Sequence, residues 1–167
     1  MEQVLTKIKQ YLTFKLDDVE YAIDVSKVRE VLEFELSTIT KLVGRDNYIS
    51  GVINLRGNVV PVMDLRLKFN MTKTEKTIDT CIIVLEVELG SEIVVIGILS
   101  DSVKEVVDLD SDHIKPAPKI GTAIDTDFIK GMGKRNEEFI VLLDIDRIFT
   151  ENELVNVKGI NEEEAVN

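Results

Sequence analysis

The sequence partly repeats itself at an interval of eighty residues. Residues 48–69, YISGVINLRGNVVPVMDLRLKF, align without gaps on residues 128–149, FIKGMGKRNEEFIVLLDIDRIF. Four residues are identical at matching positions, namely Ile49 and Ile129, Gly51 and Gly131, Asp64 and Asp144, and Phe69 and Phe149. A weaker similarity links VREVL at 28–32 to VKEVV at 103–107. A single duplication is not the pattern of a solenoid, which stacks several units. It predicts two tandem copies of one small module.

The apolar residues predict that this module is built from strands. The 167-residue chain is 44% hydrophobic but contains no Trp, so its core consists largely of Ile, Val and Leu. Such residues favour sheet. Short apolar or alternating runs are separated by polar turns, at 11–16, 20–25, 28–34, 51–55, 58–63, 80–89, 92–101, 102–109, 127–133 and 137–143. About ten short strands with few helices favour paired small barrels, because closing a sheet removes its exposed edges.

Local signals refine this prediction at a few positions. Gly57, between two apolar runs, can supply the positive φ of a tight turn. Pro61 removes a ladder donor and predicts an edge strand or a bulge. Asp64 and Asp144 each follow a strand and are predicted to cap a short helix. A helical turn is also compatible with residues 24–27.

The charge excludes some partners. A net charge of −11 argues against nucleic acid and anionic membrane surfaces, because both require basic patches. Residues 151–167 hold five Glu and one Lys, which predicts a solvated acidic C-terminal tail with at most a helical turn at 151–155. No apolar run reaches eighteen residues and no signal peptide is recognisable, so we expect a cytoplasmic protein.

Few residues are of a type and in a sequence context that indicates catalysis or metal binding. Cys81 lies in an apolar run without a Cys–His motif, which predicts a buried structural thiol. His113 is the only histidine, so a metal site is not expected. Asp64 and Asp144 raise the alternative of a hydrolase with paired carboxylates. Neither is followed by the small residues of a catalytic turn, and helix capping explains both.

Arg56 is a candidate for function because the two copies differ there. Its counterpart is Asn136, so the fold does not require an arginine, and we expect this cation only in the first copy. Arg56 is either a solvated turn residue or a group that pairs with a fixed carboxylate or a partner surface. Glu30 is the candidate carboxylate.

Three segments resemble the CheW family of chemotaxis coupling proteins. They are FKLDDVEYAIDVSKVREVL at 14–32, GVINLRGNVVPVMDLRLKF at 51–69 and VLLDIDRIF at 141–149. The NLRG element at 54–57, followed by VVPVMDLR, is the most specific. The resemblance implies an all-β fold of two tandem SH3-like five-stranded β-barrels packed on a shared core, with short helices after strands. It covers a domain at 9–150, with approximate halves 10–70 and 80–150.

The resemblance also implies a function. CheW-like proteins are adaptors without catalysis that join the cytoplasmic hairpin tips of chemoreceptors to the histidine kinase CheA, in arrays at the membrane. It therefore implies these two partners, no enzyme activity and no cofactor. An alternative is a module of the same fold in another receptor–kinase pathway, such as a CheV-type adaptor without its receiver domain.

The family's binding surfaces fall on eight residues of this chain. The kinase-facing surface falls on Val28, Glu30, Gly51 and Arg56. The receptor-facing groove falls on Val25, Gly97, Ile98 and Val103. Each has a structural alternative, since the apolar residues can belong to the core and the glycines to bulges or turns.

Overall fold

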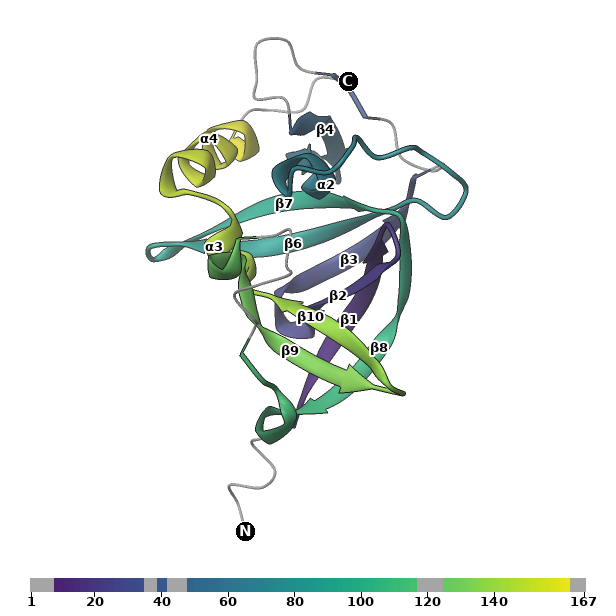
Figure 1. The fold of residues 1–167 in the computed structure, drawn as a ribbon. Coiled ribbons are helices and arrows are strands. Elements are labelled where there is room, and N and C mark those ends of the chain that lie inside the picture. The colour runs from purple at the N-terminus through teal and green to yellow at the C-terminus, as the bar shows by residue number, and fades with distance from the viewer. Residues whose placement is uncertain (1–7, 35–38, 42–47, 117–124, 163–167) are drawn as a thin grey trace.

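The protein, seen in a computed structural model that describes residues 8–34, 39–41, 48–116 and 125–162, is mostly β (Figure 1). Its described strands are β1 (Ile8–Leu16), β2 (Val19–Asp24), β3 (Val28–Glu33), β4 (Ile49–Leu55), β5 (Asn58–Met63), β6 (Cys81–Leu89), β7 (Glu92–Ser100), β8 (Ser102–Asp110), β9 (Ile129–Arg135) and β10 (Glu138–Leu143). Its described helices are η1 (Val25–Lys27), α2 (Leu65–Lys68), η3 (Ser111–His113), η4 (Thr126–Phe128), α3 (Ile145–Ile148) and α4 (Glu151–Glu162). The predicted helical turn at 24–27 is confirmed as η1, capped by the side chain of Asp24.

The strands form two five-stranded sheets, which confirms the predicted fold class of SH3-like barrels. One sheet has the order β8-β1-β2-β10-β9 and is called the lower barrel, after its place in Figure 1. The other has the order β3-β6-β7-β5-β4 and is called the upper barrel. Both orders follow one pattern, because β1–β5 of the first copy correspond to β6–β10 of the second.

The two copies exchange strands. Each barrel takes two strands from one copy and three from the other, so β1 and β2 pair with β8 and β10 while β6 and β7 pair with β3 and β5. Neither half of the chain, 10–70 or 80–150, therefore holds a complete barrel. The sequence repeat predicted the module correctly, but the barrels are intertwined along the chain.

The core has three parts. A central cluster lies between the barrels and contains Phe14, Tyr21, Ile83 and Leu85 among its members. Two smaller clusters fill the barrel interiors. Strands such as β6 contribute alternate residues to the central cluster and to a barrel interior, because successive side chains point to opposite faces. Burial on both faces explains why β6 is a continuous apolar run instead of an alternating one.

The two predicted helix caps differ. Asp64 is fully buried, and its Oδ1 accepts a hydrogen bond from the Arg66 N–H at 3.1 Å, which confirms the cap of α2. Asp144 occupies the same position before α3 but makes no side-chain capping bond. Its carboxylate lies 3.7 Å from the Arg147 guanidinium instead. The duplicated position is retained, while its capping interaction is present in one copy.

Pro61 lies in β5, an inner strand between β7 and β4, so of the two predicted alternatives the edge strand is wrong, whereas a bulge does lie next to Pro61, in the partner strand β4 opposite Val62 and Met63. Its partner in β4 is Val52, which pairs through both its N–H and its carbonyl with Thr40, at 2.8 Å each. The Val52–Pro61 pair is therefore a non-hydrogen-bonded one. The sheet needs no hydrogen bond from Pro61 to β4, and on the other side the pairing with β7 begins only at Val62, so the missing N–H falls where β5 and β7 separate and proline is tolerated there.

Gly51 marks a bulge in β4, where the pairing with β5 shifts after Ile49. It is buried, with φ of +152°, and a Cβ built on it would lie 2.2 Å from the carbonyl oxygen of Thr40. The backbone of the neighbouring segment thus excludes any side chain. The structural interpretation of Gly51 as a bulge residue is confirmed.

The C-terminal region is the largest departure from the sequence predictions. Residues expected in a solvated tail form α4, whose Leu154, Val157 and Ile160 are buried. A reciprocal capping box starts the helix: the Thr150 N–H donates to Glu153 Oε1 at 2.7 Å, and the Glu153 N–H donates to Thr150 Oγ1 at 3.1 Å. The tail prediction is therefore wrong for 151–162, while 163–167 lie outside the described residues.

Asn161 of α4 joins two strands of the upper barrel. β5 and β7 pair only through Val62 with Gly97 and Met63 with Ile98. Where they separate, the Asn161 amide donates to the carbonyls of Val59 and Val95 at 2.9 and 3.0 Å and accepts from the Val95 N–H at 2.9 Å. Backbone groups left by the separation are thereby satisfied.

Neighbouring residues of α4 test whether this helix stabilises the fold. Leu154 is 4% exposed and Val155 is 51% exposed. We expect Leu154→Ala to lower the free energy of unfolding by about 2–5 kcal/mol, because it leaves a cavity in the central cluster. Val155→Ala is expected to change it by less than about 0.5 kcal/mol. Urea denaturation measures the free energy of unfolding of both variants. Equal effects of the two substitutions would contradict the packing of α4 on the core and support a solvated tail.

Two glycines of one hairpin test the role of the bulge. A Cβ on Gly51 meets backbone, whereas a Cβ on Gly57 has no neighbour within 4 Å. We expect Gly51→Ala to destabilise the fold by about 1–3 kcal/mol through overpacking, with backbone strain in addition. Gly57→Ala, at φ of +87°, should cost only about 1 kcal/mol. Thermal unfolding of the two variants compares them, and a Gly51→Ala protein as stable as Gly57→Ala would contradict the bulge argument.

Candidate protein-binding surfaces

Arg56 and Glu30 form a bidentate ion pair on the upper barrel. Arg56 Nη1 lies 2.6 Å from Glu30 Oε2, and Nη2 lies 3.2 Å from Glu30 Oε1. The hydrogen bond from Arg56 lowers the pKa of the Glu30 carboxyl, and the bond to Glu30 raises the pKa of Arg56. Both groups are therefore charged at neutral pH, and the predicted pairing is confirmed.

The backbone presents Arg56 at the tip of a hairpin. Arg56 and Gly57 have φ of +52° and +87°, the pattern of a tight two-residue turn that follows the twist of the strands. The Asn54 side chain accepts a hydrogen bond from the Gly57 N–H at 2.9 Å and supports this turn. The Arg56 side chain is 71% exposed even while it holds Glu30. It is ordered by Glu30 and still accessible to a partner.

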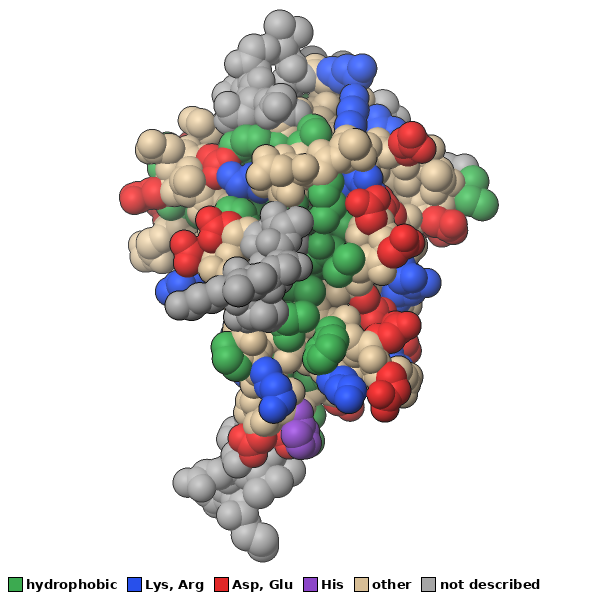
Figure 2. Space-filling view, viewed as in Figure 1, with side chains coloured by type: hydrophobic (Ala, Val, Ile, Leu, Met, Phe, Trp, Pro, Cys, Tyr) green, Lys and Arg blue, Asp and Glu red, His purple; other side chains and the backbone are tan. Residues whose placement is uncertain are grey.

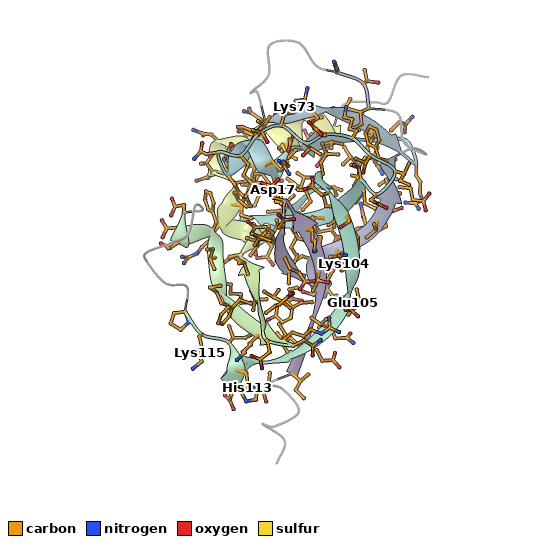
Figure 3. All side chains as sticks on the ribbon, turned by 45° about the vertical axis from the view of Figure 1, so that its right-hand side comes forward. Asp17, Lys73, Lys104, Glu105, His113 and Lys115 are labelled. Carbon is orange, nitrogen blue, oxygen red and sulfur yellow. The ribbon has the colours of Figure 1, made fainter. Side chains whose placement is uncertain are left out.

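The pair connects the two edge strands of its barrel. Glu30 lies on β3 and Arg56 follows β4, and these strands stand at opposite ends of the sheet order. The lower barrel has an equivalent pair, between Arg135 at the end of β9 and Glu105 of β8. Lys104 and Glu105 lie on the outer side of that barrel (Figure 3). The expectation that this cation belongs only to the first copy is therefore wrong.

The second copy moves the cation by one residue. Asn136, the counterpart of Arg56, adopts φ of +49° in an equivalent turn with Glu137 at +70°. Arg135 precedes this turn and reaches Glu105, which corresponds to Glu30 in the VREVL and VKEVV segments. A gap-free alignment compares identical offsets only, so it could not reveal the shifted arginine.

The other two predicted kinase-facing residues differ in exposure. Val28 is half-buried on β3 and packs against the central cluster, two residues before Glu30. Gly51 is buried and needed by the bulge. Glu30 and Arg56 are thus brought into contact, Val28 is separated from Glu30 by a bulge in β3 and faces the central cluster, and Gly51 offers no surface.

Of the four predicted receptor-facing residues, Val25, Ile98 and Val103 border or enter the central cluster, whereas Gly97 faces the interior of the upper barrel. Val25 of η1 and Val103 of β8 are half-buried and pack against it. Gly97 and Ile98 are buried in β7, Ile98 with no exposed surface, and a Cβ on Gly97 would meet Ile82 at 2.8 Å. Because both are buried, Gly97 and Ile98 can affect this region only through the packing of β7 and not by direct contact with a partner. Figure 2 shows hydrophobic side chains reaching the surface along the middle of one face.

A buried arginine ties the barrels together, and sequence reasoning missed it. Arg66 of α2, in the upper barrel, lies 2.6 Å from Asp17 in the β1–β2 turn of the lower barrel and 2.8 Å from Asp101. The Asp17 N–H donates to Asp101 Oδ2 at 2.7 Å. Asp17 lies where the two barrels meet (Figure 3). Burial alone would lower the pKa of Arg66, but the two aspartates raise it, so the guanidinium stays charged.

The duplicated junction uses the opposite charge. Asp146 of α3, the counterpart of Arg66, lies 2.9 Å from Lys27 Nζ and accepts a hydrogen bond from the Glu88 N–H at 3.2 Å. Each short helix thus reaches from its own barrel to the other one. Three acidic or basic side chains far apart in sequence meet at each junction, so no local motif indicates them.

The residues with possible chemistry have structural roles. The Asp64 carboxylate also accepts from the Thr74 N–H at 3.0 Å and from Thr74 Oγ1 at 2.7 Å, so a buried hydrogen-bond network occupies it. Cys81 is half-buried instead of buried, and burial raises the pKa of its thiol, which disfavours a reactive thiolate. The described residues contain no group of three or more His, Cys, Asp or Glu side chains that could hold a metal ion.

The described part of the chain contains no helix long and apolar enough to span a membrane.

Comparison with known proteins places this double barrel in a family. The model of the CheW-like domain matches residues 10–153. Chemotaxis protein CheW of Klebsiella aerogenes is 33% identical over 91% of this chain and 88% of its own length. Chemotaxis protein CheW of Bacillus subtilis is 30% identical over 84% of this chain and 86% of its own length. The crystal structure of the scaffolding protein TtCheW from Thermoanaerobacter tengcongensis is 34% identical, with a TM-score of 0.75 over 85% of this chain and 88% of that one. Sequence, fold and comparisons agree, and this chain belongs to the CheW-like family.

Proposed function

We propose that this chain is a cytoplasmic adaptor without catalysis that couples chemoreceptors to the histidine kinase CheA. Family membership supports a role in chemotaxis signalling. The observation that carries the proposal is the Glu30–Arg56 pair, which stands at an exposed hairpin tip within the NLRG element. The alternative of another receptor–kinase pathway uses the same fold and is separated by the binding experiments below.

The geometry of Arg56 suits recognition of a kinase. A guanidinium has five donors, and Glu30 accepts from two of its nitrogens, so other N–H groups stay available to a partner. Glu30 also holds the long side chain in place, which reduces the entropy lost on binding. In a chain with a net charge of −11, an ordered and exposed cation favours a defined orientation of the partner. Val28, across the β3 bulge from Glu30, is a further proposed contact through the exposed part of its side chain.

The region around Val25 and Val103 suits recognition of a helical receptor tip. Both side chains are half-buried and apolar, and they belong to segments that flank the central cluster between the barrels. An amphipathic helix binds by laying its apolar face in such a region. Gly97 and Ile98 would act there by shaping the sheet underneath, without contact.

Coupling follows from the rigid connection of the barrels. The central cluster, Arg66 and Asp146 all join one barrel to the other. A partner that shifts one barrel therefore shifts the other as well. An adaptor of this kind transmits changes in receptor packing to the kinase without chemistry of its own.

Charge reversal at the hairpin tip tests the kinase surface. We expect Arg56→Asp to weaken binding to CheA at least tenfold in co-sedimentation, because Asp repels Glu30 and removes the ordered cation. Arg135→Asp is the matched control, since it breaks the equivalent pair of the lower barrel. Unfolding of Arg56→Asp would make the residue structural, and equal losses in the two variants would assign no special role to the upper barrel.

An apolar-to-acidic change tests the receptor surface. The wild-type protein should co-sediment with receptor hairpin fragments, and Val25→Glu should reduce that binding at least tenfold while kinase binding persists. The control is Val106→Glu, at an exposed position of β8. A wild-type protein that binds neither receptor fragments nor CheA would contradict the adaptor function, and so would a Val106→Glu variant as defective as Val25→Glu.

A further inference from the structure

The upper barrel contains a gap between strands β5 and β7, called the upper notch, which α4 fills. The notch opens where β5 and β7 separate beyond the Val62–Gly97 pair. Val59 and Val94, three residues before this pair on each strand, are buried there at 8% and 0% exposure. Leu154 and Val157 of α4 belong to the same central cluster as Val94, and Asn161 bonds the backbone of both strands. An apolar helix face and one carboxamide are what this notch accepts.

The lower barrel repeats this strand pairing, and no helix among the described residues covers the corresponding position. Leu142 of β10 pairs with Ala22 of β2, as Val62 pairs with Gly97. Counting back three residues on each strand places Phe139 at the position of Val59 and Val19 at the position of Val94. These two side chains are 60% and 42% exposed. The lower notch is defined by Val19, Glu20 and Phe139, where Glu20 matches Val95, the residue that Asn161 bonds in the upper barrel.

The chain's own corresponding segment is used elsewhere. α4 follows α3, so its counterpart is the segment that follows α2, at 70–80, which contains no helix. Its Thr72 accepts hydrogen bonds from Arg66, and its Thr74 bonds Asp64. The segment is thereby held at the junction between the barrels and does not cover Val19 or Phe139.

The polar surroundings of the lower notch suit a helix with mixed charges. Glu20 also lines a surface hollow of about 270 Å³, whose other lining residues are Lys15, Lys104, Glu105, Arg135, Asn136 and Glu138. Its cations and acids are equal in number, which disfavours nucleic acid and other highly charged ligands. Val19 and Phe139 do not line this hollow, but each is the strand neighbour of a residue that does, Glu20 in β2 and Glu138 in β10. The two exposed apolar side chains are therefore bordered by both acids and cations, which suits an apolar helix face with polar flanks.

We propose that the lower notch binds one amphipathic helix of a second protein, built like α4. The helix carries apolar residues at positions i, i+3 and i+6 and a carboxamide at i+7, as Leu154, Val157, Ile160 and Asn161 do in α4. Its apolar face covers Val19 and Phe139, and its carboxamide bonds the backbone of Glu20. The site does not include the proposed kinase or receptor residues, and the proposal does not depend on that function.

A peptide of the chain's own helix is the probe. The labelled peptide TENELVNVKGINE, residues 150–162, is titrated with the full chain by fluorescence anisotropy. We expect saturable binding that Phe139→Asp weakens at least tenfold. The matched control is Ile78→Asp, because Ile78 is 81% exposed and lies on the connector away from the notch. A peptide with Leu154→Asp and Val157→Asp should not bind.

Further variants keep the result decisive. Val19→Asp, on the other strand, should weaken binding as Phe139→Asp does, and it replaces that variant if thermal unfolding shows Phe139→Asp to be unfolded. Absence of peptide binding would overturn the proposal. So would equal binding by Phe139→Asp and wild type, which would mean exchange with α4 on the upper barrel. A wild-type dimer in sedimentation that Phe139→Asp abolishes would also overturn it, because a second copy would then cover the notch.

Discussion

The apolar cluster between the barrels is the core that both sheets require. Strands β1, β2, β6 and β7 place alternate side chains in it and in a barrel interior, so they are stable only when both faces are covered. Burying a large side chain such as Phe14 or Leu85 contributes about 1.5–3 kcal/mol. Because each barrel also takes strands from both copies, the central cluster, the barrels and the chain topology form together.

The ion pairs at the two junctions make specific contacts between the two barrels, whose association the apolar cluster stabilises. Of these charges only Arg66 is buried, while Asp17 is exposed and Lys27 and Asp146 are partly exposed. Removal of the aspartates would leave the buried Arg66 charge without partners, which is costly. Arg66 requires Asp17 and Asp101 in one arrangement, and Asp146 requires Lys27 in one arrangement. The opposite signs at the two junctions also disfavour pairing of a short helix with the wrong one. These contacts add specific polar links between the two barrels to the apolar cluster.

The duplicated surfaces resemble each other more than the aligned sequences suggested. Both barrels join their edge strands through a Glu–Arg pair, and both turn at residues with positive φ. The barrels differ in one respect: α4 packs between β5 and β7 of the upper barrel, whereas Val19 and Phe139 at the corresponding position of the lower barrel are exposed. The difference between the copies therefore lies in the segment after each short helix, 70–80 in one and 151–162 in the other, as much as in Arg56.

Local signals in the sequence predict the module, the strands and the Asp64 cap, and they offer the Gly51 bulge and the Arg56–Glu30 pair as one of two interpretations each. These depend on local patterns, on backbone conformations that only glycine adopts, or on a motif shared with a family. A capping box at Thr150 and Glu153 with apolar residues beyond it also indicated α4, although acidic composition suggested a tail. The pairing of the strands and the contacts of Arg66 and Asp146 with the opposite barrel become visible only in the folded protein. The same holds for Arg135, which takes the place of Arg56 in the second copy, and for the burial of Gly97 and Ile98. Those features depend on contacts between residues far apart in the chain, which no local pattern records.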